Sequence, residues 1–110
     1  MTKKKKSSGT RRVKYFRDVR QTKDFLSDWD RLEDSGQHDL NRVKEAMAIL
    51  AVNNGSMPPE WKDHELNGKL SKYRECHIKG DLLLIYEVQE GSKVDVLVLV
   101  RLGTHSEIFG

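Results

Sequence analysis

The stretch YRECHIKGDLLLIYEVQEGSKVDVLVLVRL, residues 73–102, decides the fold class of this 110-residue chain. Its apolar segments are separated by Lys79-Gly80 and by Glu90-Gly91-Ser92, and turns this short join neighbouring strands as hairpins. The last two segments are apolar on both faces, which is typical of strands inside a sheet. The three predicted strands run roughly over residues 73–78, 81–88 and 93–102.

Upstream of these strands, two segments have the apolar spacing of amphipathic helices. The first has Thr22 or Asp24 as its N-cap and ends near Ser35-Gly36. The second has Asp39 as its N-cap and ends at Asn53-Asn54-Gly55. Their apolar stripes comprise Phe25, Leu26, Trp29 and Leu32, and then Leu40, Val43, Met47, Leu50 and Ala51. The short turn between them predicts an antiparallel helical hairpin.

Residues 13–19 predict one more strand, so the element order is β-α-α-β-β-β. We therefore predict an α+β domain, in which an antiparallel sheet of about four strands carries the N-terminal helical hairpin on one face. The other face would be free for function. Residues 1–12 have no side chain to bury and are predicted to form a flexible basic arm, ahead of a single domain over 13–110.

The formal net charge of +3 conceals an asymmetry. Residues 1–14 carry seven basic side chains and no acid, so the remaining residues carry 13 basic and 17 acidic side chains. This excludes a domain that coats nucleic acid with uniform positive charge. No apolar run approaches the roughly 18 residues that span a bilayer, and no signal peptide is visible. The single Cys76 excludes an intramolecular disulfide and fits a reducing compartment, so we expect a cytoplasmic protein without a membrane partner.

Three of the four histidines fall in the C-terminal half, at loop or strand-end positions: His64, His77 and His105. Imidazoles that converge on one open face would supply both the acid and the base of a proton-transfer reaction. The alternative is that they are separate surface residues. Strand alternation places Glu75 and His77 on one face and Cys76 on the other. This argues against a Cys–His nucleophilic pair or a zinc ion shared by the two, and predicts that Cys76 is a core residue.

Two aromatic side chains are candidates for stacking on a nucleic-acid base. Trp61 lies in the charged loop that precedes the predicted strands, where it would either stack on a base or anchor the loop on the core, and burial statistics favour the anchor. Phe109, near the end of the chain, would serve as a stacking platform or pack on the sheet.

Four motifs follow one another along the chain: Lys62–Gly68, Tyr73–His77, Asp81–Tyr86 and Arg101–Gly110. Together they resemble the YafQ branch of the RelE toxin superfamily, the mRNA interferases of bacterial type II toxin–antitoxin systems. The resemblance covers roughly residues 16–110. The chain departs from the family pattern at Glu75, where the family commonly has Asp, in a longer hairpin around residues 90–92 and in the Lys-rich arm.

The resemblance implies cleavage of messenger RNA in the ribosomal A site, without a metal or another cofactor. The implied partners are ribosome-bound mRNA, ribosomal RNA and a cognate antitoxin protein. Carried over by motif, the catalytic residues are His64, His77, Asp81 and His105, and Phe109 matches the terminal phenylalanine.

Such a reaction has simple requirements, because RNA carries its own nucleophile, the 2′-hydroxyl. A base removes the 2′ proton, a cation stabilises the charge that develops on phosphorus, and an acid protonates the 5′ oxygen. We expect His105 to act as acid or base opposite His77 or His64. The remaining candidates are Asp81 and Glu75, which would orient the imidazoles, and Arg101 or Arg74, which would stabilise phosphate.

The alternative function is a non-catalytic RelE-fold module that binds nucleic acid or acts as a co-repressor. Such a module would have lost several of the motif histidines, and none is lost in this chain.

Overall fold

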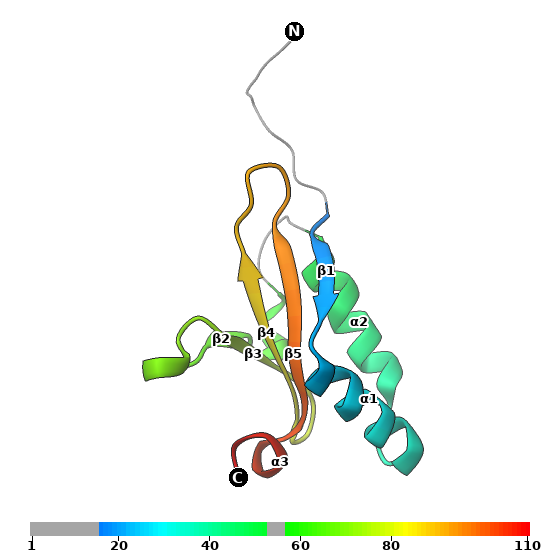
Figure 1. Cartoon of the computed structure of the whole chain (residues 1–110). Coiled ribbons are helices and arrows are strands. Elements are labelled where there is room, and N and C mark those ends of the chain that lie inside the picture. Colours follow the sequence, from blue (N-terminus) through cyan, green and yellow to red (C-terminus); the bar gives the residue numbers. More distant parts are fainter. Residues whose placement is uncertain (1–15, 53–56) are drawn as a thin grey trace, which may run out of the picture.

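The computed structural model describes residues 16–52 and 57–110, which form a mixed five-stranded sheet with its helices (Figure 1). The strands are β1 (Asp18–Gln21), β2 (His64–Glu65), β3 (Arg74–Lys79), β4 (Leu82–Gln89) and β5 (Val96–Thr104), in the order β1-β5-β4-β3-β2. The helices are α1 (Lys23–Ser35), α2 (Leu40–Ala51) and the short α3 (His105–Phe109), with 3₁₀ turns η1 (Pro59–Trp61) and η2 (Gly68–Leu70). The predicted α+β class is confirmed.

Local sequence sets the ends of α1 and α2 as predicted. Thr22 Oγ1 accepts a hydrogen bond from the backbone N–H of Phe25 at 3.0 Å, and Gly36, with φ of 66°, ends α1 in the left-handed conformation. Asp39 caps α2 by accepting from the backbone N–H of Asn41 at 3.0 Å. The predicted helix stop at residues 53–55, the basic arm and the beginning of the predicted first strand lie outside the described residues.

The apolar core lies between the two long helices and one face of the sheet. Cys76 of β3 has no exposed surface, which confirms it as a core residue facing away from His77. Burial raises the pKa of its thiol to about 12, so the thiolate that a nucleophile needs does not form near neutral pH. Within the described part of the chain, no helix has both the length and the apolar character to cross a membrane.

Trp61 is an anchor of this core and offers no ring face to a base. The side chain is 1% exposed, and the guanidinium of Arg42 lies 3.8 Å from the ring centroid. The interpretation of Trp61 as a loop anchor is therefore confirmed, and its candidacy as a stacking platform for RNA is wrong. The physical reason is that the turn η1 carries the indole inward, where its large apolar surface leaves water.

The sheet differs from the prediction at both edges. β1 runs over Asp18–Gln21, two residues past the predicted end at residue 19, and it pairs with β5 in parallel, with Asp18 opposite Val96. All four β1 residues are exposed, so the strand has no buried face to impose a clear apolar alternation. At the other edge, two residues of the predicted loop pair with β3 as β2. A two-residue strand is too short to show any period in the sequence.

A β-bulge in β5 changes which side chains reach the open face of the sheet. Ile85 is opposite Arg101, but the next residue of β4, Tyr86, is opposite Leu99. Val100 is therefore an extra residue that reverses the alternation beyond it. Leu99 and Leu102 consequently both enter the core, and Arg101 turns to the face that the long helices leave free.

Candidate active site

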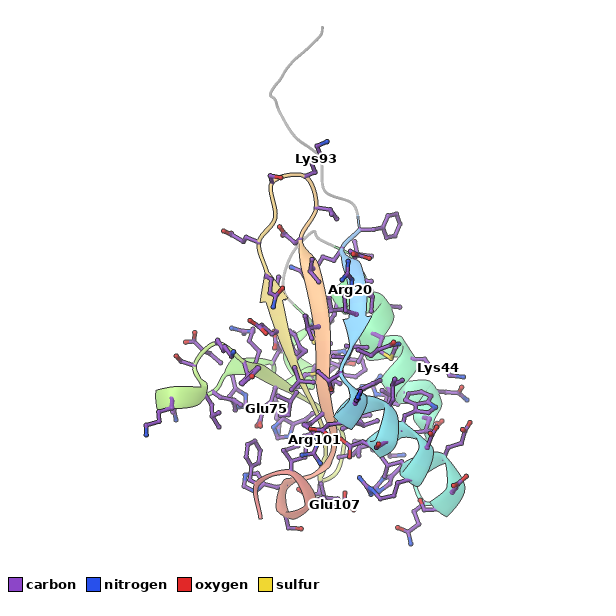
Figure 2. All side chains as sticks on the ribbon, viewed as in Figure 1. Arg20, Lys44, Glu75, Lys93, Arg101 and Glu107 are labelled. Carbon is purple, nitrogen blue, oxygen red and sulfur yellow. The ribbon has the colours of Figure 1, made fainter. Side chains whose placement is uncertain are left out.

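The open face of the sheet carries most of the predicted site residues. Leu83 and Ile85 of β4 form its floor and are only 2% and 3% exposed. Ile85 is opposite Glu75 on one side and Arg101 on the other. Beside Arg101, a cavity of about 220 Å³ is lined by apolar groups of η2, β4, β5 and α3, including Ile85 and Phe109. Figure 2 shows Glu75, Arg101 and Glu107 in the half of the molecule that holds α3, far from Lys93 at the hairpin tip.

Two imidazoles meet at one carboxylate on this face. Oε2 of Glu75 lies 3.1 Å from Nε2 of His64 and 3.5 Å from Nε2 of His77. The two rings are 6.1 Å apart between centroids. The Glu75 side chain is 10% exposed, whereas those of His64 and His77 are 51% and 33% exposed. The pair of histidines is thus open to a ligand, while the carboxylate that joins them is largely shielded.

The contacts of His64 fix the role of one ring nitrogen and the direction of the other. Nδ1 lies 2.7 Å from the backbone carbonyl oxygen of Lys62, which only accepts, so Nδ1 carries a hydrogen and donates it. Nε2 faces the Glu75 carboxyl. A proton must lie between Nε2 and Oε2 for that contact to be a hydrogen bond, whichever of the two atoms holds it. The His64 ring is thus oriented with Nε2 toward the Glu75 carboxylate on the open face.

Asp63, which precedes His64, anchors the loop from the other side of the sheet. The Tyr86 hydroxyl donates to Asp63 Oδ1, and Arg74 donates to both carboxylate oxygens at 3.3 Å. Burial and the hydrogen bond to Asp63 raise the pKa of Tyr86, so the phenol keeps its proton. Lys62, just before Asp63, ends the turn η1 in the left-handed conformation, with φ of 51°. Arg74 is thus committed to this anchor and does not lie with the histidines.

His105 begins α3 at the end of β5. Thr104 caps the helix by accepting from the backbone N–H of Glu107 at 3.3 Å, and Glu107 Oε1 accepts from the backbone N–H of Thr104 at 2.8 Å. The rings of His105 and Phe109 are 4.9 Å apart, and both side chains are exposed. Register places α3 near His77, because Leu83 of β4 is opposite His77 on one side and Gly103 on the other.

Asp81, like Trp61 and Arg74, is a predicted site residue that the structure places apart from the histidines. It is exposed in the turn before β4, and within residues 16–52 and 57–110 it forms no hydrogen bond or ion pair with an imidazole. The structure adds Asp28, a buried carboxylate of α1 that binds the Arg101 guanidinium through Nε at 2.7 Å. A charged residue in line with Phe25 and Leu32 on the apolar stripe was the signal in the sequence that would have revealed it.

The ligand atoms of His64, Glu75 and His77 lie within 4.8 Å of one another, so these three residues form a group that could hold a metal ion. Two imidazole nitrogens and one carboxylate oxygen suit zinc and copper. The same atoms suit acid–base chemistry when no ion is bound.

Comparison with known proteins identifies the class to which this fold and site belong. The family model described as "Bacterial toxin of type II toxin-antitoxin system, YafQ" matches residues 17–110. The mRNA interferase toxin YafQ of Escherichia coli strain B / BL21-DE3 is 32% identical over 94 residues, which cover 86% of this chain and 97% of that protein. The chain therefore belongs to the YafQ family of toxins of type II toxin–antitoxin systems.

Solved structures agree with this assignment. The crystal structure of YafQ from Escherichia coli strain BL21(DE3) superposes with a TM-score of 0.75 at 31% identity, covering 86% of this chain and 99% of that one. The DinJ–YafQ toxin–antitoxin complex from Escherichia coli gives a TM-score of 0.73 at 32% identity, covering 86% and 98%. A copper-bound mutant toxin from Helicobacter pylori gives 0.73 at 37% identity, covering 84% and 98%.

Proposed function

We propose that this chain is an mRNA interferase that cleaves messenger RNA in the ribosomal A site by histidine acid–base catalysis without a catalytic metal. The observation that carries the proposal is the meeting of His64 and His77 at the Glu75 carboxylate, on the same open face as Arg101. The names of its relatives, mRNA interferase toxins, support the class of reaction. The ribosome as the site of action follows from the family resemblance.

In the proposed reaction, the 2′-oxygen attacks phosphorus and the bond from phosphorus to the 5′ oxygen breaks. One histidine accepts the 2′ proton, and a second gives a proton to the departing 5′ oxygen. The products are a 2′,3′-cyclic phosphate and a 5′-hydroxyl, so no external oxidant or cofactor is needed. The His64–Glu75 and His77–Glu75 contacts support one proton-exchanging group on β2 and β3. His105 on α3 supplies the opposite one.

Arg101 is the proposed partner of the phosphate. It is the arginine of the open face, whereas Arg74 is held by Asp63 and Tyr86. A guanidinium presents several N–H groups in a fixed fork, which matches the oxygens of a phosphoryl group as charge develops on them. Phe109, exposed beside the apolar cavity, offers a ring face to a neighbouring base.

The proposed partner that silences the toxin is a cognate antitoxin. The DinJ–YafQ complex among the structural neighbours supports this, because a toxin that arrests translation must be held inactive in its host. Such an antitoxin would act by covering the face between His64 and His105 or by making the complex too bulky for the A site.

A metal ion at His64, Glu75 and His77 would compete with the proposed chemistry. The copper-bound toxin from Helicobacter pylori supports metal binding by this fold. An ion supplies Lewis acidity, but it occupies the nitrogen lone pairs that a base needs. We therefore propose that the metal-free form is the active one.

The test compares induced expression of the wild type, H105A and the triple variant H64A/H77A/H105A. The control is H38A, which removes the fourth histidine, at the turn between α1 and α2. We expect the wild type and H38A to arrest growth and to produce translation-dependent cuts in mRNA, and H105A to lose activity by about 10²–10⁴-fold. Equal toxicity of the wild type and a folded triple variant would contradict the proposal. Tight RNA binding by the wild type without any cut would favour the non-catalytic module instead.

A further inference from the structure

Asp28 is a buried charge that the proposed reaction does not use. Asp28 is 5% exposed and lies on the face of α1 that packs Phe25 and Leu32 into the core. Burying a carboxylate is costly unless its oxygens are paired. Oδ2 accepts from Arg101 Nε at 2.7 Å and from the backbone N–H of Leu102 at 2.9 Å. Oδ1 accepts from Nη2 of Arg101 at 3.2 Å and from Nη2 of Arg31 at 3.4 Å.

The position of α1 beside β5 explains these contacts. β1 pairs with β5 only as far as Leu99, and beyond that point α1 takes its place along the strand edge. Thr22 Oγ1 donates to the carbonyl oxygen of Val100 at 2.7 Å, and Asp28 accepts the edge N–H of Leu102. The bulge at Val100 turns Arg101 to the open face next to this edge. The Asp28 carboxylate thus accepts a backbone hydrogen bond at the edge of β5 and also binds the Arg101 guanidinium.

This arrangement leaves a defined part of Arg101 free for a ligand. Asp28 engages Nε and Nη2, and within the described residues Nη1 has no protein partner. The side chain is 30% exposed and borders the apolar cavity with Ile85 and Phe109. Arg101 thus lies on the face that carries Glu75 and the histidines, with Nη1 not engaged by Asp28.

A second link from α1 reaches the helix of His105. Nη1 of Arg31 lies 2.8 Å from Oε2 of Glu107, whose Oε1 accepts the backbone N–H of Thr104. His105 follows Thr104 directly. The same turn of α1 therefore contacts both Arg101 and the cap of α3.

We propose that Asp28 is a positioning residue for RNA cleavage, which holds the Arg101 guanidinium so that Nη1 faces the scissile phosphate. The inference rests on the proposed function, in which Arg101 stabilises charge on phosphorus. An arginine without this contact would have to be ordered in each catalytic cycle, whereas a donor already in place costs no reorganisation. Displacement by about 1 Å is enough to lower a rate by about 10²-fold.

The decisive experiment is a double-mutant cycle on cleavage of ribosome-bound mRNA by the purified full chain. D28N preserves the size of the side chain and an oxygen for the Leu102 N–H, and D30N on the exposed side of α1 is the matched control. We expect D28N to lower kcat by about 10–100-fold with KM for the ribosome nearly unchanged. We expect no further loss when D28N is added to R101A, because Asp28 acts through Arg101.

A merely structural Asp28 would give a different pattern, in which the losses from D28N and R101A multiply. That result, or wild-type kcat in D28N beside an impaired R101A, would overturn the inference and leave the proposed function standing. Wild-type cleavage by R101A would overturn the role of Arg101 as well. R101K guards against poor folding of D28N, because lysine keeps the charge and loses the fork. We expect R101K to be as impaired as R101A, and wild-type kcat in R101K would also overturn the inference.

Discussion

Asp63 and His64 are adjacent in sequence, but their side chains lie on opposite faces of the sheet. Asp63 turns to the core side, where it accepts from Tyr86 and Arg74. His64 turns to the open face and contacts Glu75. The position of the imidazole thus depends on an anchor that never touches the open face.

Replacing Tyr86 with Phe should therefore impair both stability and cleavage. The variant removes the hydroxyl that binds Asp63 and leaves a largely buried carboxylate short of a donor, a loss of about 1–3 kcal/mol in the free energy of unfolding. Denaturant unfolding measures this loss, and cleavage of ribosome-bound mRNA should fall with it. Y73F, a tyrosine of the open face, is the control for removing a hydroxyl. Full stability and activity in Y86F would show that the anchor is not needed.

Glu75→Gln should remove the negative charge that the two imidazoles share, without changing the size of the side chain. Because Gln lacks the negative charge that stabilises an imidazolium beside it, we expect kcat to fall by about 10²-fold or more. Circular dichroism should be unchanged. E87Q, in the neighbouring strand β4, is the control and should cleave like the wild type. Wild-type kcat in E75Q would remove Glu75 from the mechanism.

Metal removal should leave cleavage intact. A chelator that takes zinc and copper but spares Mg²⁺ should not lower the rate on ribosomes, and added Cu²⁺ should lower it by occupying His64, Glu75 and His77. H77A should weaken Cu²⁺ binding, as measured by calorimetry. Loss of activity on chelation, or a stoichiometric zinc or manganese ion needed for cleavage, would contradict the metal-free reaction.

The loss of folding stability at acid pH should depend on Asp28. Burial alone would raise the pKa of Asp28, but hydrogen bonds from Arg101 and Leu102 and the charge of Arg101 lower it below its usual value. The stabilisation is therefore present above the unfolded pKa of about 3.9 and is lost as the pH falls through the lower folded value. The free energy of unfolding of the wild type, measured in urea, should fall as the pH falls from about 5 to 2. That of D28N should fall less.

Glu107 contributes to the same loss of stability at acid pH. The hydrogen bond from the Thr104 N–H lowers its pKa, burial partly opposes this, and the charge of Arg31 lowers the pKa further. D28N should therefore retain part of the pH dependence. The control D30N should follow the wild type at every pH. Equal slopes for D28N and the wild type would show that the Asp28 contacts do not stabilise the fold.

Deleting residues 2–12 should weaken ribosome binding most at low ionic strength. These residues lie outside the described part of the chain, and their six basic side chains would displace counterions from ribosomal RNA. Cleavage at saturating toxin should stay nearly unchanged, because the deletion spares the candidate site. Filter binding across a salt series measures the effect. Equal binding of both proteins at every salt concentration would mean that the segment is an inert tail.

Sequence by itself determined the elements whose signals are local. Thr22, Gly36 and Asp39 set helix ends because each acts on backbone groups within a few residues. Alternation in β3 assigned Cys76 to the core and His77 to the other face, because the side-chain period of a strand is two. The class of the fold and the face that carries Glu75 followed from these signals.

Tertiary structure alone decided how distant segments meet. His64 reaches Glu75 because the two-residue strand β2 pairs with β3, and no periodicity can reveal a pairing so short. The bulge at Val100 turns Arg101, which regular alternation would send into the core with Leu99, toward the open face. Asp28 gains its partners only because α1 replaces β1 along the edge of β5. Each of these depends on hydrogen bonds between residues far apart in the chain, and such bonds leave no pattern in the local sequence.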